Sequence, residues 1–128
     1  MTRNVADRRL RRALVVEDSV MIAMETEDCL RELGVEEVES ANSVAGAVAA
    51  LNRAEFNLAV LDYNLGDETS DAVAQRLTER RIPFAVATGY GDMGDHFSQL
   101  GALSVLTKPY SKADLSELVD KVANNPAP

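Results

Sequence analysis

The sequence predicts an α/β fold in which five strand–helix units build one parallel sheet with helices on both faces. Short apolar runs of four or five residues alternate with amphipathic stretches along the whole chain of 128 residues. Such short continuous runs are typical of parallel strands that are buried on both faces. Parallel strands need crossover connections, and an amphipathic helix after each strand supplies them. The sequence contains no internal repeat or linker, so one domain is expected.

The first two units each place a short strand before an amphipathic helix. Residues 13–16 form a β-branched apolar run, and Asp18 or Ser19 can cap the helix that follows. Gly34 is placed to end that helix. Residues 37–40 are a short strand with polar neighbours, which favours the edge of a sheet. The first helix carries an apolar stripe of Ile22, Thr26, Cys29, Leu30 and Leu33, and the second, over residues 43–52, carries Val44, Val48 and Leu51.

The last three units follow the same order. Three apolar runs are the expected strands: residues 58–61, 84–87 and 103–107. Helices are expected over residues 70–80 and from a cap at Ser111 onward. The helix between residues 92 and 100 is weaker, because glycines interrupt it. One face of the last helix carries Leu115, Leu118, Val119 and Val122.

Charge is distributed unevenly along the chain. The chain has 13 Lys and Arg residues and 21 Asp and Glu residues, which gives a formal net charge of −8. Five arginines lie within residues 1–12, so we expect a solvated basic leader there, with a phosphate-binding arm as the alternative. Residues 13–123 are expected to fold and residues 124–128 to form a disordered tail. The acidic balance of the folded part repels polyanions and argues against a nucleic-acid partner.

Cysteine use and hydropathy indicate a cytoplasmic protein. Cys29 is the single cysteine, which excludes an intrachain disulfide and fits a reducing compartment. No apolar stretch approaches the roughly 20 residues that a membrane span needs. The N-terminus lacks the apolar core of a secretory signal. We therefore expect no membrane partner.

Polar side chains follow four of the expected strands at the point where each strand ends. They are Glu17 and Asp18, then Asp62, then Thr88, then Lys108. Alone, each has a simple explanation, such as a helix cap for Asp18 or a turn for Asp62. Together they converge, because the carboxyl ends of parallel strands meet at one edge, where open α/β sheets bind their ligands.

The sheet edge where these strand ends are expected to meet carries an excess of negative charge. Three carboxylates held close together repel one another unless a cation compensates them. Lys108 supplies one positive charge, and a hard divalent ion such as Mg²⁺ suits both carboxylate and phosphate oxygens. A metal-bound carboxylate beside an ammonium and a hydroxyl is an arrangement for phosphoryl transfer, in which the carboxylate attacks phosphorus.

These positions resemble the receiver domain of two-component response regulators. The matching residues are Glu17-Asp18, Asp62, Thr88 and Lys108-Pro109. The resemblance covers residues 13–122 and implies a flavodoxin-like (βα)5 fold with strand order 2-1-3-4-5. It implies a phosphoacceptor that assists its own phosphotransfer and dephosphorylation rather than an enzyme.

The resemblance also implies a role for each residue in phosphoryl transfer. Asp62 is the acceptor for a phosphohistidine on a sensor histidine kinase. Lys108 pairs with the phosphoryl group, and Thr88 moves in to hydrogen-bond it. The peptide bond between Lys108 and Pro109 is expected to be cis, as in relatives.

Mg²⁺ is the cofactor that the resemblance implies. Asp18 and Asp62 bind it directly. The main-chain carbonyl of Asn64 is the third protein ligand, and Glu17 acts largely through water.

Two loops carry a narrower resemblance. Residues 62–66 with Ser70, and residues 83–91, resemble the FAT GUY receivers of alphaproteobacteria. Those are stand-alone regulators that pair with HWE or related (HisKA2) histidine kinases. The resemblance therefore implies output by contact with a downstream protein, which the sequence does not identify, or use as a phosphate sink.

One position departs from the family pattern. Most receivers carry Tyr or Phe three residues before the lysine, whereas this chain has Val105, which has no ring and one preferred rotamer. Tyr90 is the nearest substitute, and we predict that it responds to phosphorylation; a surface aromatic beside the site is the alternative. His96, the only histidine, is expected on a helix surface.

Two other classes of function are alternatives to a regulator. A receiver-like scaffold would bind partners without phosphorylation and without Mg²⁺. A haloacid-dehalogenase-type phosphatase needs a second aspartate two residues after the nucleophile, where this chain has Asn64. Because the chain keeps every acidic ligand and Lys108, the regulator is favoured.

Overall fold

Five parallel strands form the centre of the molecule. The computed structural model describes residues 10–89 and 94–124, and within them the strands are β1 Arg12–Val16, β2 Glu37–Ala41, β3 Leu58–Asp62, β4 Phe84–Thr88 and β5 Ser104–Thr107. They pair in the order β2-β1-β3-β4-β5, and every pairing is parallel. The predicted fold class and strand order are confirmed.

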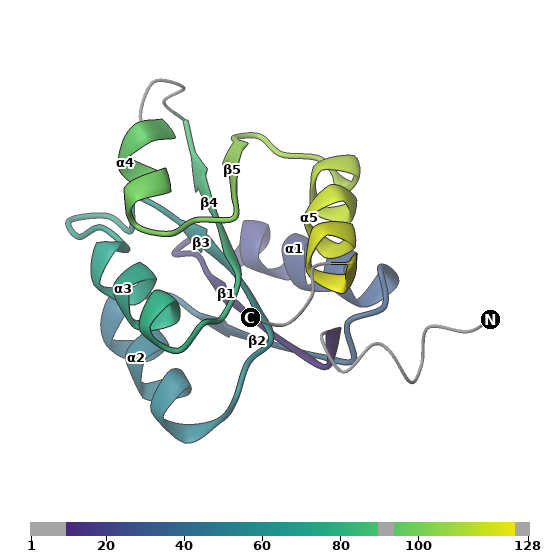
Figure 1. The fold of residues 1–128 in the computed structure, drawn as a ribbon, viewed down its shortest axis with the longest axis horizontal. Coiled ribbons are helices and arrows are strands. Elements are labelled where there is room, and N and C mark those ends of the chain that lie inside the picture. The colour runs from purple at the N-terminus through teal and green to yellow at the C-terminus, as the bar shows by residue number, and fades with distance from the viewer. Residues whose placement is uncertain (1–9, 90–93, 125–128) are drawn as a thin grey trace.

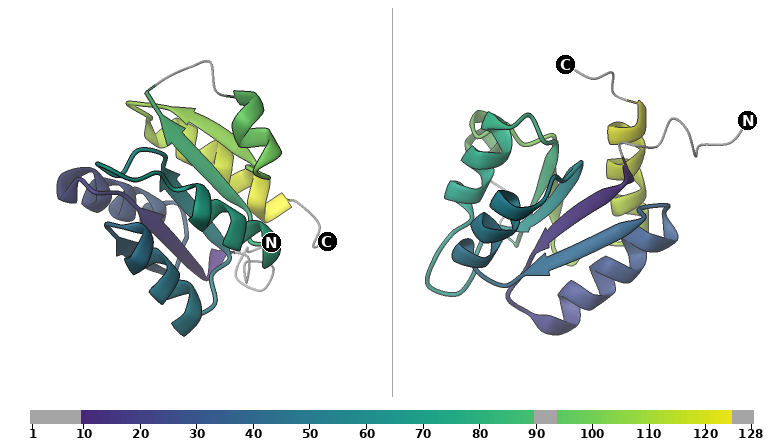
Figure 2. Two further views of the ribbon diagram at one scale, coloured as in Figure 1. Left: turned by 90° about the vertical axis from the view of Figure 1, so that its left-hand side faces the viewer. Right: turned by 90° about the horizontal axis from the view of Figure 1, so that it is seen from below.

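Helices cover both faces of this sheet. They are α1 Val20–Glu32, α2 Val44–Arg53, α3 Asp71–Glu79, α4 Gly94–Gln99 and α5 Lys112–Asn124. α1 and α5 lie on one face, and α2, α3 and α4 on the other (Figure 1, and from two further sides in Figure 2). Among the described residues, none of the helices has both the length and the apolar character that crossing a membrane requires.

Each face of the sheet buries its own hydrophobic core. Along β1, Leu14 and Val16 belong to the core under α2 and α3, whereas Ala13 and Val15 belong to the core under α1 and α5. Successive side chains of a strand point to opposite faces, which produces this division. All residues of β3 and β4 are buried. Burial on both faces is the reason why these strands stand out as continuous apolar runs.

The predicted caps begin and end the helices. Ser19 Oγ accepts a hydrogen bond from the Ile22 amide at 3.3 Å. Gly34 follows α1 with φ of 108°, a left-handed conformation that glycine adopts without strain. Ser111 and Asp114 cap α5 reciprocally, with amide-to-side-chain distances of 2.9 and 3.2 Å.

The N-terminal boundary of the fold differs from the expected one. β1 begins at Arg12, inside the segment expected as a solvated leader, and Leu10 is 1% exposed in the core under α1 and α5. The Arg12 amide donates to Asn57 Oδ1 at 3.0 Å, and its Nε donates to Glu37 Oε1 at 2.9 Å. These partners are 45 and 25 residues away, so local sequence patterns did not reveal them.

Helix α1 differs from the prediction in one detail. Its buried residues are Ala23, Thr26 and Leu30, while Ile22 and Cys29 of the predicted stripe are only half-buried. α4 spans six residues, inside the stretch between residues 92 and 100 where a weak helix was expected.

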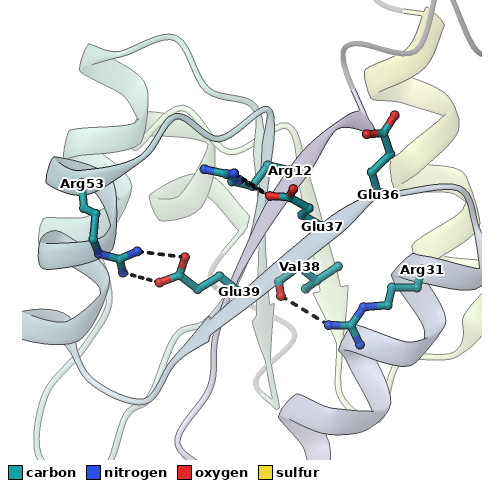
Figure 3. Close-up of a pocket in the computed structure, with 7 residues that line it drawn as sticks. All are labelled: Arg12, Arg31, Glu36, Glu37, Val38, Glu39 and Arg53. Carbon is teal, nitrogen blue, oxygen red and sulfur yellow. Dashed lines mark hydrogen bonds and ion pairs between the residues drawn. The ribbon is translucent and has the colours of Figure 1, made fainter.

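β2 is an edge strand, as its polar residues predicted. Arg12 and Arg53 pair with Glu37 and Glu39, and the Arg31 guanidinium donates to the Val38 carbonyl at 3.4 Å (Figure 3). These side chains line a pocket along the strand. Charged side chains on an edge discourage pairing with a further strand.

Candidate functional site

Three carboxylates meet at the carboxyl ends of β1 and β3. Glu17 and Asp18 directly follow β1, and Asp62 is the last residue of β3. One carboxylate oxygen from each residue lies within 4.8 Å of the others. Glu17 is 4% and Asp62 is 5% exposed, whereas Asp18 is exposed. The structure therefore brings together the three acids that the strand ends predicted.

Strand pairing is what places these acids side by side. β1 and β3 are parallel neighbours, with Val16 opposite Leu61, so the residues that follow emerge at the same level. The Glu17 amide continues the ladder to β2 by donating to the Ala41 carbonyl at 2.9 Å. The Glu17 carboxylate in turn accepts a hydrogen bond from the Ser19 amide at 3.1 Å.

Lys108 brings a positive charge to the carboxylates. Its Nζ lies 3.3 Å from Asp62 Oδ1 and 3.8 Å from Glu17 Oε1. The Lys108 amide donates to the Thr88 carbonyl at 2.9 Å, which extends the pairing of β4 and β5 by one residue. The bond to Pro109 is cis, as the resemblance implied.

Thr88 lies at the same edge of the sheet. It ends β4 and is 2% exposed. The residue before it, Ala87, pairs with Asp62 across β3 and β4. Tyr90, the predicted substitute for the missing aromatic ring, lies outside the described residues.

The loop after β3 passes close to the carboxylates. Asn64 is exposed and forms an isolated bridge with Thr69. Gly66 has φ of 81°, which favours glycine, and a Cβ there would lie 4.0 Å from Asp18 Oδ2. Ser70 closes the loop and is 1% exposed, and its Oγ has no hydrogen-bond partner within the described part of the chain.

Tyr110 is a residue of this region that the sequence analysis did not identify. Its hydroxyl lies 2.7 Å from Thr26 Oγ1, which ties the loop that carries Lys108 to α1. Burial raises the pKa of Tyr110, and the negative charges of Glu17 and Asp62 add to the rise, so the phenol stays protonated. Thr26 is 84 residues away in sequence, and no local pattern connects the two.

Burial makes the fully charged carboxylate cluster unfavourable. Burial is the largest of the effects that raise the pKa of Glu17 to about 7, and the negative charge of Asp62 adds to it. The Ser19 amide and Lys108 act in the opposite direction. A cation bound by hard oxygen ligands would relieve the remaining repulsion, and carboxylate oxygens are ligands of that kind. The residues present therefore fit Mg²⁺.

The raised pKa of Glu17 predicts how pH affects stability without metal. The folded protein holds the Glu17 proton up to about pH 7, whereas the unfolded chain releases it near 4.5, so stability falls as pH rises between these values. Glu17→Gln removes this loss and is expected to raise the free energy of unfolding at pH 8 by about 1–2 kcal/mol. Urea unfolding in EDTA at pH 5 and pH 8 measures the effect.

An exposed acid provides the control for this variant. Glu55 is exposed between α2 and β3, and Glu55→Gln should change stability little at either pH. If Glu17→Gln is no more stable than wild type at pH 8, ionisation of Glu17 does not destabilise the folded protein.

Comparison with known proteins identifies the family of the chain. The family model described as the response regulator receiver domain matches residues 13–120. The chain belongs to this family. Receiver domains of two-component response regulators accept a phosphoryl group, bind Mg²⁺, and interact with sensor histidine kinases and downstream effectors. They are not classical enzymes.

Several known proteins are similar to this receiver domain. The transcriptional regulatory protein PdtaR of Mycobacterium tuberculosis is 29% identical over 113 residues, which are 86% of this chain and 55% of PdtaR. A CheY-like receiver domain protein from Methanospirillum hungatei is 27% identical, with a TM-score of 0.79 over 90% of this chain and 94% of its own. The chain spans about half the length of the curated relatives it matches.

A third similar structure was solved as a complex. TrrA of Thermotoga maritima was solved in complex with Mg²⁺ and BeF, and its TM-score with this receiver domain is 0.76 over 88% of this chain and 98% of its own. Its identity of 23% supports the fold alone.

Proposed function

We propose that this receiver domain accepts a phosphoryl group on Asp62 from a phosphohistidine of a sensor histidine kinase, in a reaction that depends on Mg²⁺. The observation that carries the proposal is the surroundings of Asp62. Its carboxylate is buried, lies within 4.8 Å of the carboxylates of Glu17 and Asp18, and is 3.3 Å from Lys108 Nζ. Output then occurs by contact with a downstream protein or by use as a phosphate sink.

The carboxylates and the neighbouring loop are the proposed magnesium ligands. Asp18 and Asp62 would hold the ion directly, the main-chain carbonyl of Asn64 would be the third protein ligand, and Glu17 would act largely through water. The raised pKa of Glu17 and the nearness of Gly66 in the Asn64 loop to Asp18 support this set. Bound there, Mg²⁺ would offset the carboxylate repulsion and stabilise negative charge on phosphoryl oxygens.

The transfer needs a nucleophile and two groups that stabilise charge. An oxygen of the Asp62 carboxylate attacks phosphorus, the P–N bond breaks as the P–O bond forms, and the electron pair leaves with the kinase imidazole. The Lys108 ammonium pairs with one phosphoryl oxygen, and the Thr88 hydroxyl donates to another. Hydrolysis of the resulting acyl phosphate returns the carboxylate.

The kind of kinase is proposed from two loops. The likeness of residues 62–66 with Ser70, and of residues 83–91, to FAT GUY receivers supports a stand-alone regulator that pairs with an HWE or HisKA2 kinase. Tyr90 lies in the second stretch and remains a candidate for a side chain that responds to phosphorylation.

A small phosphodonor tests the proposal. Phosphoramidate has a P–N bond like that of phosphohistidine, and with Mg²⁺ we expect one phosphoryl group per protein by intact mass, located on Asp62 by peptide mapping. EDTA should abolish the labelling. Asp67→Asn, which alters an exposed acid of the same loop, should be labelled like wild type. A protein that stays unmodified and binds no Mg²⁺ would instead be an interaction scaffold.

A further inference from the structure

We propose that the side chain of Tyr63 transmits the phosphorylation state of the site to α4. The route runs through Asp71 and His96, and the inference rests on the proposed phosphorylation of Asp62. Val105, where most receivers carry an aromatic ring, is 41% exposed on β5 and has no ring to move. The connection must therefore use other side chains.

The main chain of Tyr63 is joined to both parts of the site that change on phosphorylation. The Tyr63 amide, which belongs to the peptide group after Asp62, donates to the Ala87 carbonyl at 2.9 Å. That carbonyl belongs to the peptide group that precedes Thr88. The Tyr63 carbonyl accepts from the Ser70 amide at 3.0 Å. A displacement of the phosphoacceptor or of the threonine therefore displaces Tyr63 as well.

The side chain of Tyr63 reaches α3 and α4 through polar contacts. Its hydroxyl donates to Asp71 Oδ2 at 3.2 Å and lies 3.5 Å from His96 Nε2. His96 Nε2 lies 3.0 Å from the other Asp71 oxygen, and the Thr69 hydroxyl donates to Asp71 at 3.1 Å. Burial and the Asp71 carboxylate raise the pKa of Tyr63, so its hydroxyl remains a donor.

The ring of Tyr63 packs against two successive residues of α4. Its centroid lies 4.9 Å from that of Phe97 and 5.9 Å from that of His96, in edge-on geometries. Phe97 is fully buried in the core under α3, so it fixes α4 to the sheet. The side chains of Asp71 and His96 are 37% and 41% exposed.

The partial exposure of Asp71 and His96 permits two arrangements of the Tyr63, Asp71 and His96 side chains. Water can replace the half-exposed contacts of Asp71 and His96, while the Tyr63–Phe97 packing stays in the core. Phosphorylation adds negative charge at Asp62, next to the Tyr63 peptide group, and so favours one arrangement over the other. The orientation of α4 follows the arrangement that is populated.

Amide NMR with Mg²⁺, recorded with and without beryllofluoride, tests the route. In wild type we expect shifts at Asp62, at Thr88 and along Gly94–Gln99. Tyr63→Phe keeps the ring and removes the hydroxyl, so the site shifts should persist while the mean shift of α4 falls by at least about half. His96→Gln should reduce the α4 shifts in the same way. The double variant Tyr63→Phe with His96→Gln should reduce them no further than either single variant.

The matched control removes a hydroxyl from the other face of the sheet. Ser104→Ala breaks the contact with Lys121 of α5 and should leave the α4 response as in wild type. Equal α4 responses in wild type and Tyr63→Phe, an equal loss in Ser104→Ala, or a loss found only in Tyr90→Ala would each overturn the route through Tyr63. Absence of any shift at Asp62 and Thr88 in wild type would overturn the proposed function and this inference with it.

Discussion

Asp62→Asn is expected to abolish phosphotransfer from a sensor histidine kinase, by more than about 10³-fold, while the fold is retained. The amide oxygen of asparagine is a far weaker nucleophile than a carboxylate and carries no charge that could hold Mg²⁺. Asparagine fills nearly the same volume at this buried position, so the loss reports chemistry and not packing.

Transfer of a radiolabelled phosphoryl group from prelabelled kinases measures this effect. A panel that includes HWE and HisKA2 kinases also shows which class transfers fastest, and we expect that class to be one of these. Asp67→Asn is the control, since it removes an exposed carboxylate of the same loop. Equal labelling of wild type and Asp62→Asn would show that Asp62 is not the acceptor.

Lys108→Ala is expected to strengthen Mg²⁺ binding while it slows phosphoryl transfer by about 10²–10³-fold. The ammonium lies 3.3 Å from Asp62 Oδ1 and 3.8 Å from Glu17 Oε1, so it neutralises part of the charge that attracts the metal. Without it the affinity for Mg²⁺ should rise by about tenfold, which corresponds to about 1.4 kcal/mol. Transfer slows because the ammonium no longer stabilises the phosphoryl oxygens.

Titration calorimetry and phosphoramidate kinetics separate these two effects. Rates are compared at saturating Mg²⁺, so the gain in metal affinity does not mask the loss in transfer. Lys112→Ala is the matched control, because this lysine starts α5 and pairs with Glu32 at 2.7 Å on the surface. Weaker Mg²⁺ binding in Lys108→Ala would show that the lysine supports the metal site and does not compete with it.

Periodicity predicted the elements of the fold because burial is regular along each of them. The central strands are buried on both faces and the helices on one, and both patterns are visible in the sequence. The strand order came from the family resemblance, since pairing across long connections leaves no periodic signal. The start of β1 was missed because Leu10 and Arg12 depend on contacts with distant residues.

The acidic residues of the site could be predicted because the topology of the sheet determines where they lie. Residues that follow neighbouring parallel strands must emerge together, and Glu17, Asp18 and Asp62 do. The contact of Tyr63 with His96 had no such signal. The two residues are 33 apart, and only the packing of α4 beside α3 brings them together. His96 was expected on a helix surface, and it is indeed half-exposed.

The charged β2 edge also affects whether copies of this domain associate with one another. A second β2 strand laid alongside would set the glutamates of two molecules face to face, while Arg12 and Arg53 are already engaged within their own molecule. Polymerisation by continuous sheet extension along this flank is thereby disfavoured.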